Sequence, residues 1–207
     1  HDRARLQNGS ELGAGGRGVY ALAITDPRHF DSGDVMWEFN STDDPDMGQF
    51  VGRPYMGLTE DGNWVAAFGN GYNSASQHAV LFIRNLATGA SIAKIDTGVG
   101  CSSLATNCTT GPNGLATAML VDNTGDGVGD TIYAGDYLGN MWRFEYVNSE
   151  WQLGNGGQPI FVAKDGNEAT AKRQSITSGV YTVAHPLGGT MLVFGTGRYL
   201  NADDADD

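Results

Sequence analysis

The chain has 207 residues, of which 40% are hydrophobic and 10% aromatic, enough apolar material for one sizeable core and too much for a disordered protein. Its net charge of −12, from 12 basic and 24 acidic residues, argues against a nucleic-acid-binding protein, because such proteins need clustered Lys and Arg. No apolar run approaches the roughly 20 residues of a membrane helix, and the first five residues lack the apolar core of a signal peptide. We therefore expect a mature or excised chain without a transmembrane segment.

A glycine-rich stretch at residues 13–18 matches the letters of the dinucleotide fingerprint GxGxxG. That fingerprint must open a helix whose N-terminus holds a pyrophosphate, whereas the residues that follow here are typical of a strand. We interpret the stretch as a turn before a strand.

Short apolar segments bounded by Gly-rich turns then predict strands along the whole chain, and no long helix is predicted. The 31 glycines against 6 prolines suit the tight turns that short strands need. The predicted strands are residues 18–25, 35–39, 64–69, 79–86, 91–96, 119–121, 131–134, 140–146 and 191–194.

Three of these segments form a weak internal repeat in which an apolar strand ends in a glycine turn: residues 64–71, 131–136 and 191–197, about 60 residues apart. Within the all-β class, a period in this range favours a β-propeller over a sandwich. About three to four blades fit this length, whereas a closed ring typically needs about four to eight. We therefore expect residues 1–207 to be a single domain, a quinoprotein-like part of a larger propeller whose two terminal blades are incomplete.

Cys101 and Cys108 lie in a polar loop with six residues between them. A disulfide that closes this loop is favoured over two free thiols, because exposed loop thiols without a metal partner have little other use. A zinc site would need two more ligands, and none is adjacent in the sequence.

Residues 122–130, Asp-Asn-Thr-Gly-Asp-Gly-Val-Gly-Asp, have the spacing of a calcium loop. Oxygens of Asp122, Thr124 and Asp126 stand at positions 1, 3 and 5 of the loop, and the following glycine permits a sharp turn. The Val128 carbonyl and the Asp130 carboxylate can complete the shell at positions 7 and 9. Because only oxygen ligands are offered, Ca²⁺ suits the loop better than zinc, copper or the more demanding magnesium.

The loop differs from an EF-hand, because Tyr133 stands at position 12 where that motif needs a bidentate Glu, and because strands flank it. Asp130 must then supply the closing carboxylate. The alternative is an Asp- and Gly-rich β-turn that carries no metal, but turns rarely need acids at positions 1, 5 and 9 as well as Gly at position 6.

At this loop the sequence resembles the C-terminal propeller domain of the PilY/PilC family, the type IV pilus assembly factors and tip adhesins. The resemblance spans most of the chain, although Thr124 replaces the usual Asn or Asp and Ala23 stands where the family often has Asp. The segments that carry it are residues 13–22, 25–27, 68–72, 121–127, 130, 133–136, 139–140, 142–144 and 194–200.

The resemblance implies that Asp122, Thr124, Asp126, the Val128 carbonyl and Asp130 bind Ca²⁺. It implies a bacterial protein that is exported through the periplasm to the cell surface or pilus tip. Its partners would be pilus minor subunits or other pilus machinery, with a host or abiotic surface as a further partner. Calcium occupancy would regulate pilus extension against retraction, and with it surface adhesion and twitching motility.

A rival hypothesis is a calcium-dependent quinoprotein dehydrogenase, whose propeller has similar Gly- and Trp-rich blades. That enzyme needs an axial quinone pocket with aromatic or disulfide walls and a catalytic acid. Cys101 and Cys108 are not the vicinal pair such pockets often use, and a partial propeller cannot form an axial pocket. We therefore expect a noncatalytic module.

Overall fold

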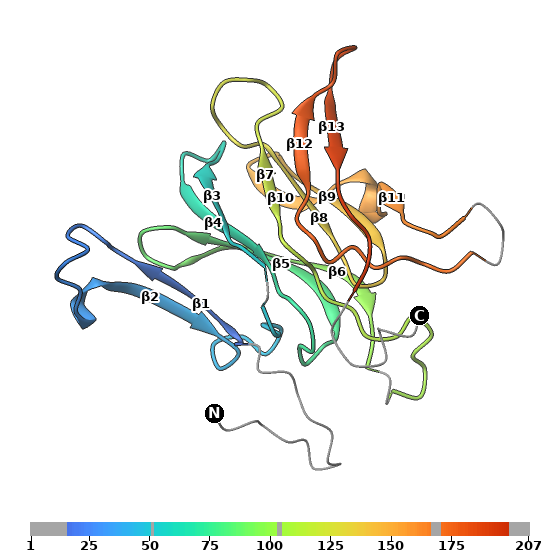
Figure 1. Cartoon of the computed structure of the whole chain (residues 1–207), viewed down its shortest axis with the longest axis horizontal. Helices are drawn as coiled ribbons and strands as arrows, with labels where there is room; N and C mark the ends of the chain where they lie inside the picture. The colour runs from blue at the N-terminus through green and yellow to red at the C-terminus, as the bar shows by residue number, and fades with distance from the viewer. Residues whose placement is uncertain (1–15, 51, 103–104, 167–170, 199–207) are drawn as a thin grey trace.

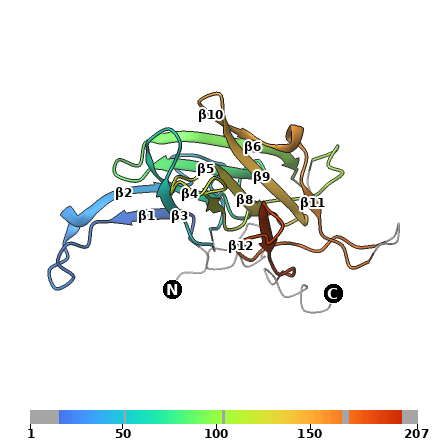
Figure 2. The same cartoon turned by 90° about the horizontal axis from the view of Figure 1, so that it is seen from above.

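The protein is described by a computed structural model covering residues 16–50, 52–102, 105–166 and 171–198. Within these residues the strands form antiparallel sheets that follow one another in chain order, like sectors of a fan (Figures 1 and 2). The strands are β1 (Gly18–Leu22), β2 (Val35–Asn40), β3 (Tyr55–Leu58), β4 (Trp64–Gly69), β5 (His78–Asn85), β6 (Ser91–Gly100), β7 (Met119–Val121), β8 (Thr131–Gly135), β9 (Asn140–Val147), β10 (Glu150–Leu153), β11 (Phe161–Val162), β12 (Tyr181–Ala184) and β13 (Thr190–Val193). The helices of this part of the chain are the short 3₁₀ turns η1 (Ser32–Asp34) and η2 (Asn155–Gly157), and neither is long and apolar enough to cross a membrane.

Two of the sheets are complete meanders, β3-β4-β5-β6 and β7-β8-β9-β10, the second with β11 added beside β9. They are flanked by two strand pairs, β1-β2 on the N-terminal side and β12-β13 on the C-terminal side. The predicted repeat falls on equivalent strands, because β4, β8 and β13 each follow the first strand of their sheet. The all-β prediction and the repeat are therefore confirmed, while residues 13–15 of the 13–18 stretch lie outside the described residues.

The central strands of the full sheets are buried on both faces, which explains why β4 and β5 have continuous apolar runs instead of alternating ones. In β4, Val65 and Ala67 pack toward β7–β10, whereas Ala66 and Phe68 pack toward β1-β2. Because successive side chains of a strand point to opposite faces, one strand contributes to two cores.

The cores lie between neighbouring sheets. The largest joins β3–β6 to β7–β10 around Leu81, Trp142 and Phe144. A second, around Phe39 and Phe68, joins the β1-β2 pair to β3–β6. A third joins β7–β11 to the chain around β12-β13, and its buried members are Met141, Ala163, Ile176 and Val180.

Four strands were not predicted, namely β3, β10, β11 and β12. β3 follows Pro54 and contains Gly57, β10 alternates polar and apolar residues over only four positions, and β11 has two residues. These segments become strands because a stronger neighbour offers a free edge to pair with, as β9 does for both β10 and β11.

Buried polar side chains follow the second strand of each complete sheet. Asn70, just after β4, donates its amide to the carbonyls of Asp46 and His78. Its carbonyl oxygen accepts from the backbone N–H groups of Val80 and Leu115. All four hydrogen-bonding positions of a buried amide are thereby satisfied, and the side chain ties one sheet to the entry of the next.

Asp136, just after β8, occupies the matching place and is fully buried. Its Oδ1 accepts from the Asn140 N–H at 2.8 Å. Its Oδ2 accepts from the side chains of Asn113, Asn140 and Trp142 at 2.9, 2.7 and 2.8 Å. The first two glycine turns of the repeat are therefore polar junctions that join successive sheets.

Candidate metal centre

The predicted calcium loop joins β7 to β8. Both strands are anchored by buried side chains, Leu120 on β7 and Ile132 on β8, and the Asp130 N–H donates to the Val121 carbonyl at 3.0 Å to close the base of the loop. Residues 123–127 are exposed. The loop rises from β7 beside the β12-β13 hairpin (Figure 1).

Asp122 organises the first half of the loop. Its Oδ1 accepts from the N–H groups of Thr124 and Gly125 at 3.0 and 2.6 Å and from the Thr124 hydroxyl at 3.1 Å. Its Oδ2 accepts from the Gly127 N–H at 2.7 Å. The bonds from Gly127 and Gly125 hold the pKa of the Asp122 carboxyl below its ordinary value.

Glycine is required at the turn itself. Gly125 and Gly127 have φ values of 83° and 87°, in the left-handed region that other residues rarely adopt. The predicted role of Gly127 in a sharp turn is thus seen in the backbone.

The second half of the loop is held by two further carboxylates. Asp126 is exposed, and its Oδ1 accepts from the Val128 N–H at 2.9 Å. Asp130 accepts from the N–H and side-chain amide of Asn123 at 3.0 and 2.7 Å and from the Thr131 hydroxyl at 2.7 Å. Asn123 was not among the predicted site residues, because in a calcium loop position 2 normally carries no ligand.

The five predicted ligands therefore share one loop, but their carboxylates are held separately. Hydrogen bonds join Thr124 to Asp122 and connect Asp126 to the Val128 backbone, while Asp130 is held by Asn123 and Thr131. In the part of the chain that the structure describes, no group of three or more His, Cys, Asp or Glu side chains is gathered for a metal ion.

The chemistry of the loop nevertheless suits a hard cation. Its donors are oxygen atoms, and none of the ion pairs found among the described residues involves Asp122, Asp126 or Asp130. The negative charge of these carboxylates is met by backbone and side-chain dipoles of the loop. The calcium site remains a prediction that the donor set favours.

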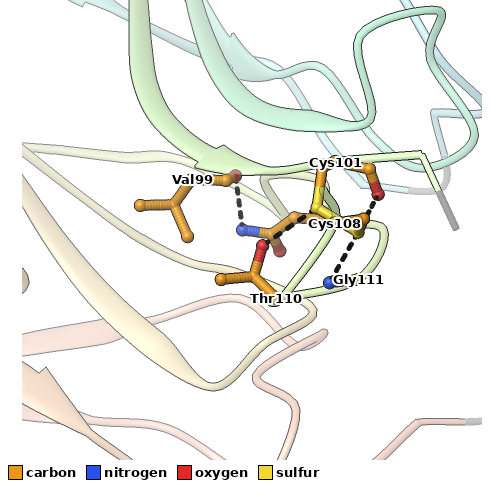
Figure 3. The surroundings of a disulfide bond; sticks show 6 residues. Val99, Cys101, Cys108, Thr110 and Gly111 are labelled. Carbon is orange, nitrogen blue, oxygen red and sulfur yellow. Dashed lines mark hydrogen bonds between the residues drawn. A yellow bond between two sulfur atoms is a disulfide. The ribbon is translucent and has the colours of Figure 1, made fainter. Parts of the chain in front are cut away.

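The loop that contains the two cysteines lies where β6 passes to β7. Cys101 and Cys108 are joined there by a disulfide, with Cα atoms 5.5 Å apart (Figure 3). Gly111 is tied to both ends, because its N–H points to the Cys108 sulfur at 3.2 Å and its carbonyl accepts from the Cys101 N–H at 2.9 Å. The pair therefore acts in the structure as a covalent closure of an inter-sheet connection.

Two comparisons with known proteins extend over nearly the whole chain. The family model described as the PilY1 beta-propeller domain matches residues 6–207. A type IV pilus biogenesis factor PilY1 homolog of Xylella fastidiosa is 41% identical over 93% of this chain, and PilY1 of Pseudomonas aeruginosa strain PAO1 is 36% identical over 94%. This chain spans only 14% and 17% of the length of those two relatives.

A solved structure gives the same answer for the fold. The crystal structure of the Pseudomonas aeruginosa PilY1 C-terminal domain matches with a TM-score of 0.77 and 33% sequence identity, covering 93% of this chain and 41% of that one. The prediction of an all-β, partial β-propeller of about three to four blades is confirmed, because the described residues form two complete sheets flanked by two strand pairs, and so is the family resemblance. This chain belongs to the PilY1 beta-propeller domain family.

Proposed function

We propose that this chain is a noncatalytic, calcium-binding module of a type IV pilus biogenesis factor, in which calcium occupancy of residues 122–130 regulates pilus extension, retraction and surface adhesion. The observation that carries the proposal is an exposed, all-oxygen loop, organised around Asp122, in a chain of the PilY1 propeller family.

Charge explains how the loop would respond to the ion. Three carboxylates within nine residues repel one another, and without a cation this repulsion is offset by the loop's own hydrogen-bond donors and by screening from water. Bound Ca²⁺ would supply a positive charge to the carboxylates of Asp122, Asp126 and Asp130, with the Thr124 hydroxyl and the Val128 carbonyl as neutral ligands. Because the ion would bind the ordered loop better than the disordered one, it would stabilise the ordered state.

The place and partners of the module follow from its relatives. They are described as type IV pilus biogenesis factors, so pilus minor subunits or other pilus machinery are the proposed partners. We propose that the protein is exported through the periplasm and resides at the pilus tip or cell surface, where such factors would act. Contact with a host or abiotic surface would be made by the larger protein at that site.

A quinoprotein enzyme is the weaker candidate. A cleft of about 450 Å³ lies where β3, β7 and β12 begin, which is where an axial cofactor would be sought. Its lining includes Arg53, Tyr72 and Thr117, and the residues that form it include no Asp or Glu to serve as the catalytic acid. Reduction of a redox dye by the protein supplied with the quinone, calcium and an alcohol would favour the enzyme instead.

Calorimetric titration with calcium chloride tests the proposed site. We expect the wild-type protein to bind one ion with an affinity in the broad micromolar to millimolar range and to melt at a higher temperature with calcium than with a chelator. Asp126→Ala should abolish both effects while the strands remain folded, because the Asp126 side chain makes only a local bond to the Val128 N–H.

Asp165→Ala provides a matched control, because Asp165 is an exposed turn carboxylate that accepts a backbone N–H from Lys172. This variant should bind calcium like the wild type. An Asp126→Ala protein with an unchanged titration would show that the site has been placed wrongly.

A further inference from the structure

The loop at residues 122–130 is hydrogen-bonded to strands of three different sheets. Its Gly129 N–H donates to the Leu58 carbonyl of β3 at 2.8 Å. Its Asp130 carbonyl accepts from the Tyr146 N–H of β9 at 3.1 Å. Its Asn123 side-chain oxygen, Oδ1, accepts from the Thr190 hydroxyl of β13 at 2.6 Å. Ordering of this loop would therefore stabilise its contacts with the β3–β6 sheet, with its own sheet and with the β12-β13 pair.

Asn123 connects the last of these contacts to the proposed ion. The same amide donates to Asp130 Oδ1 at 2.7 Å and accepts from the Thr190 hydroxyl, while the Asn123 backbone N–H donates to Asp130 Oδ2. An amide has its donor and acceptor on opposite atoms, so a single orientation of Asn123 satisfies both neighbours. Asn123 thus spans the distance between a predicted calcium ligand and β13.

Away from the loop, the β12-β13 hairpin is held at its base, where the Ser178 hydroxyl donates to the Gly195 carbonyl at 3.0 Å. It is a sheet of two strands, and one of its faces is open to solvent, with Tyr181 68% exposed and Val193 54% exposed. Leu192, on the other face, packs against the third core. An isolated two-stranded sheet is marginally stable, so one added tie at its end has a measurable effect on its local opening.

We infer that Asn123 is a positioning residue, which sets the Asp130 carboxylate for calcium and, through Thr190, couples occupancy of the loop to the order of the β12-β13 hairpin. The inference rests on the proposed calcium site and adds the residue that transmits its state. Coupling of this kind is reciprocal, so loosening the hairpin contact weakens calcium binding, and calcium slows opening of the hairpin.

Thr190→Val tests the coupling without altering any proposed ligand. Valine keeps the shape of threonine and removes the hydroxyl that donates to Asn123. We expect calcium affinity, measured by calorimetry, to fall about three- to tenfold, the range of one lost hydrogen bond. In hydrogen exchange of the wild-type protein, calcium should slow the amides of β12 and β13, and Thr190→Val should remove most of that slowing.

Thr182→Val is the matched control, because Thr182 is the other threonine of the same hairpin and has no hydrogen bond to the loop among the described residues. It should leave both readouts as in the wild type. Asn123→Ala, which removes the bonds to Asp130 and Thr190 together, should weaken calcium binding more than Thr190→Val does.

The outcomes separate this inference from the proposed function. If the wild type binds calcium but Thr190→Val and Thr182→Val behave alike, the coupling is wrong and the calcium site stands. If the wild type binds no calcium, both are wrong. Should Asn123→Ala fail to fold, the comparison of the two threonine variants still gives the answer.

Discussion

Asp136 and Asp122 each accept four hydrogen bonds, yet the two carboxylates hold together very different parts of the molecule. The donors to Asp136 are one backbone N–H and three side chains, and one of them, Asn113, lies 23 positions away. The donors to Asp122 all lie within five residues of it. Asp136 is fully buried, whereas Asp122 has an unburied carboxylate in an exposed loop.

The difference shows that the number of hydrogen bonds does not by itself set the role of a residue. At Asp136 the donors are fixed by two sheets and shielded from water, so they have no alternative partner. At Asp122 the donors are three backbone N–H groups and one hydroxyl of an exposed loop that water can reach, so the carboxylate can exchange these donors for a cation. The first arrangement is suited to holding the fold, and the second to responding to a ligand.

Replacing Asp136 by alanine should have the largest effect on stability. The change leaves the buried N–H groups of Asn113, Asn140 and Trp142 without their acceptor. We expect the free energy of unfolding to fall by about 3 kcal/mol or more, measured by urea denaturation in a chelator. The free energy of unfolding of Asp136→Asn, which keeps one acceptor oxygen, should lie between those of Asp136→Ala and the wild type.

Asp122→Ala is the comparison for that measurement. Under the same calcium-free conditions this variant should lower the free energy of unfolding by less than about 1 kcal/mol, because water replaces the carboxylate as acceptor for the exposed N–H groups. Equal losses for the two alanine variants would contradict the distinction between a structural and a responsive carboxylate.

Asp122 and Asp136 also show which parts of the site could be predicted from the sequence. The spacing of Asp122, Asp126 and Asp130 around Gly127 marked them as a site, because coordination by a short loop is a local property. Asp136 was seen only as part of a glycine turn, since its donor Asn113 lies 23 positions away in the connection from β6 to β7, and no local pattern contains that contact. Asn123 was missed for the same reason, because its importance comes from Thr190 on a distant strand.

Strands, too, were predicted where the local sequence pattern is strong and missed where pairing with a neighbour decides. β4 and β5 were predicted because they carry long apolar runs that are buried on both faces, and β9 because it follows the second copy of the repeat. β3 and β12 were not, because each is short and is recruited by the edge of the strand beside it. Non-local pairing is thus the part of both fold and site that the sequence left open.

The ion pairs of Lys94 are intermediate in burial between the Asp136 and Asp122 sites. Its ammonium group contacts Asp44 and Asp46 at 2.9 and 2.8 Å, and these side chains are only 20% and 18% exposed. Although burial pushes the pKa of Asp46 up, hydrogen bonds from Lys94 and Ser76 hold it below its ordinary value. Here a fixed positive side chain fills the place that a bound cation would take.

Lys94→Met, which keeps the apolar stem and removes the charge, should lower the free energy of unfolding by about 1 kcal/mol, more at low salt than at high salt. Urea denaturation at two salt concentrations measures this. A loss as large as that of Asp136→Ala, or one that salt does not change, would mean that packing of the lysine stem and not its charge is responsible.

The smallest expected effect is the response of the calcium-free loop to acid. The pKa of Asp122 is lowered by the N–H groups of Gly127 and Gly125, so the bonds stabilise the folded loop above the unfolded pKa of about 3.9 and are lost as pH falls through the lower folded value. The amide resonances of Gly125 and Gly127 should therefore shift together with a midpoint below about pH 3.9 in a chelator. Asp122→Asn should remove this transition, since its side chain does not titrate. A midpoint at or above that of an unfolded aspartate would show that these bonds do not favour the charged carboxylate, and that the loop is not organised around Asp122 before calcium binds.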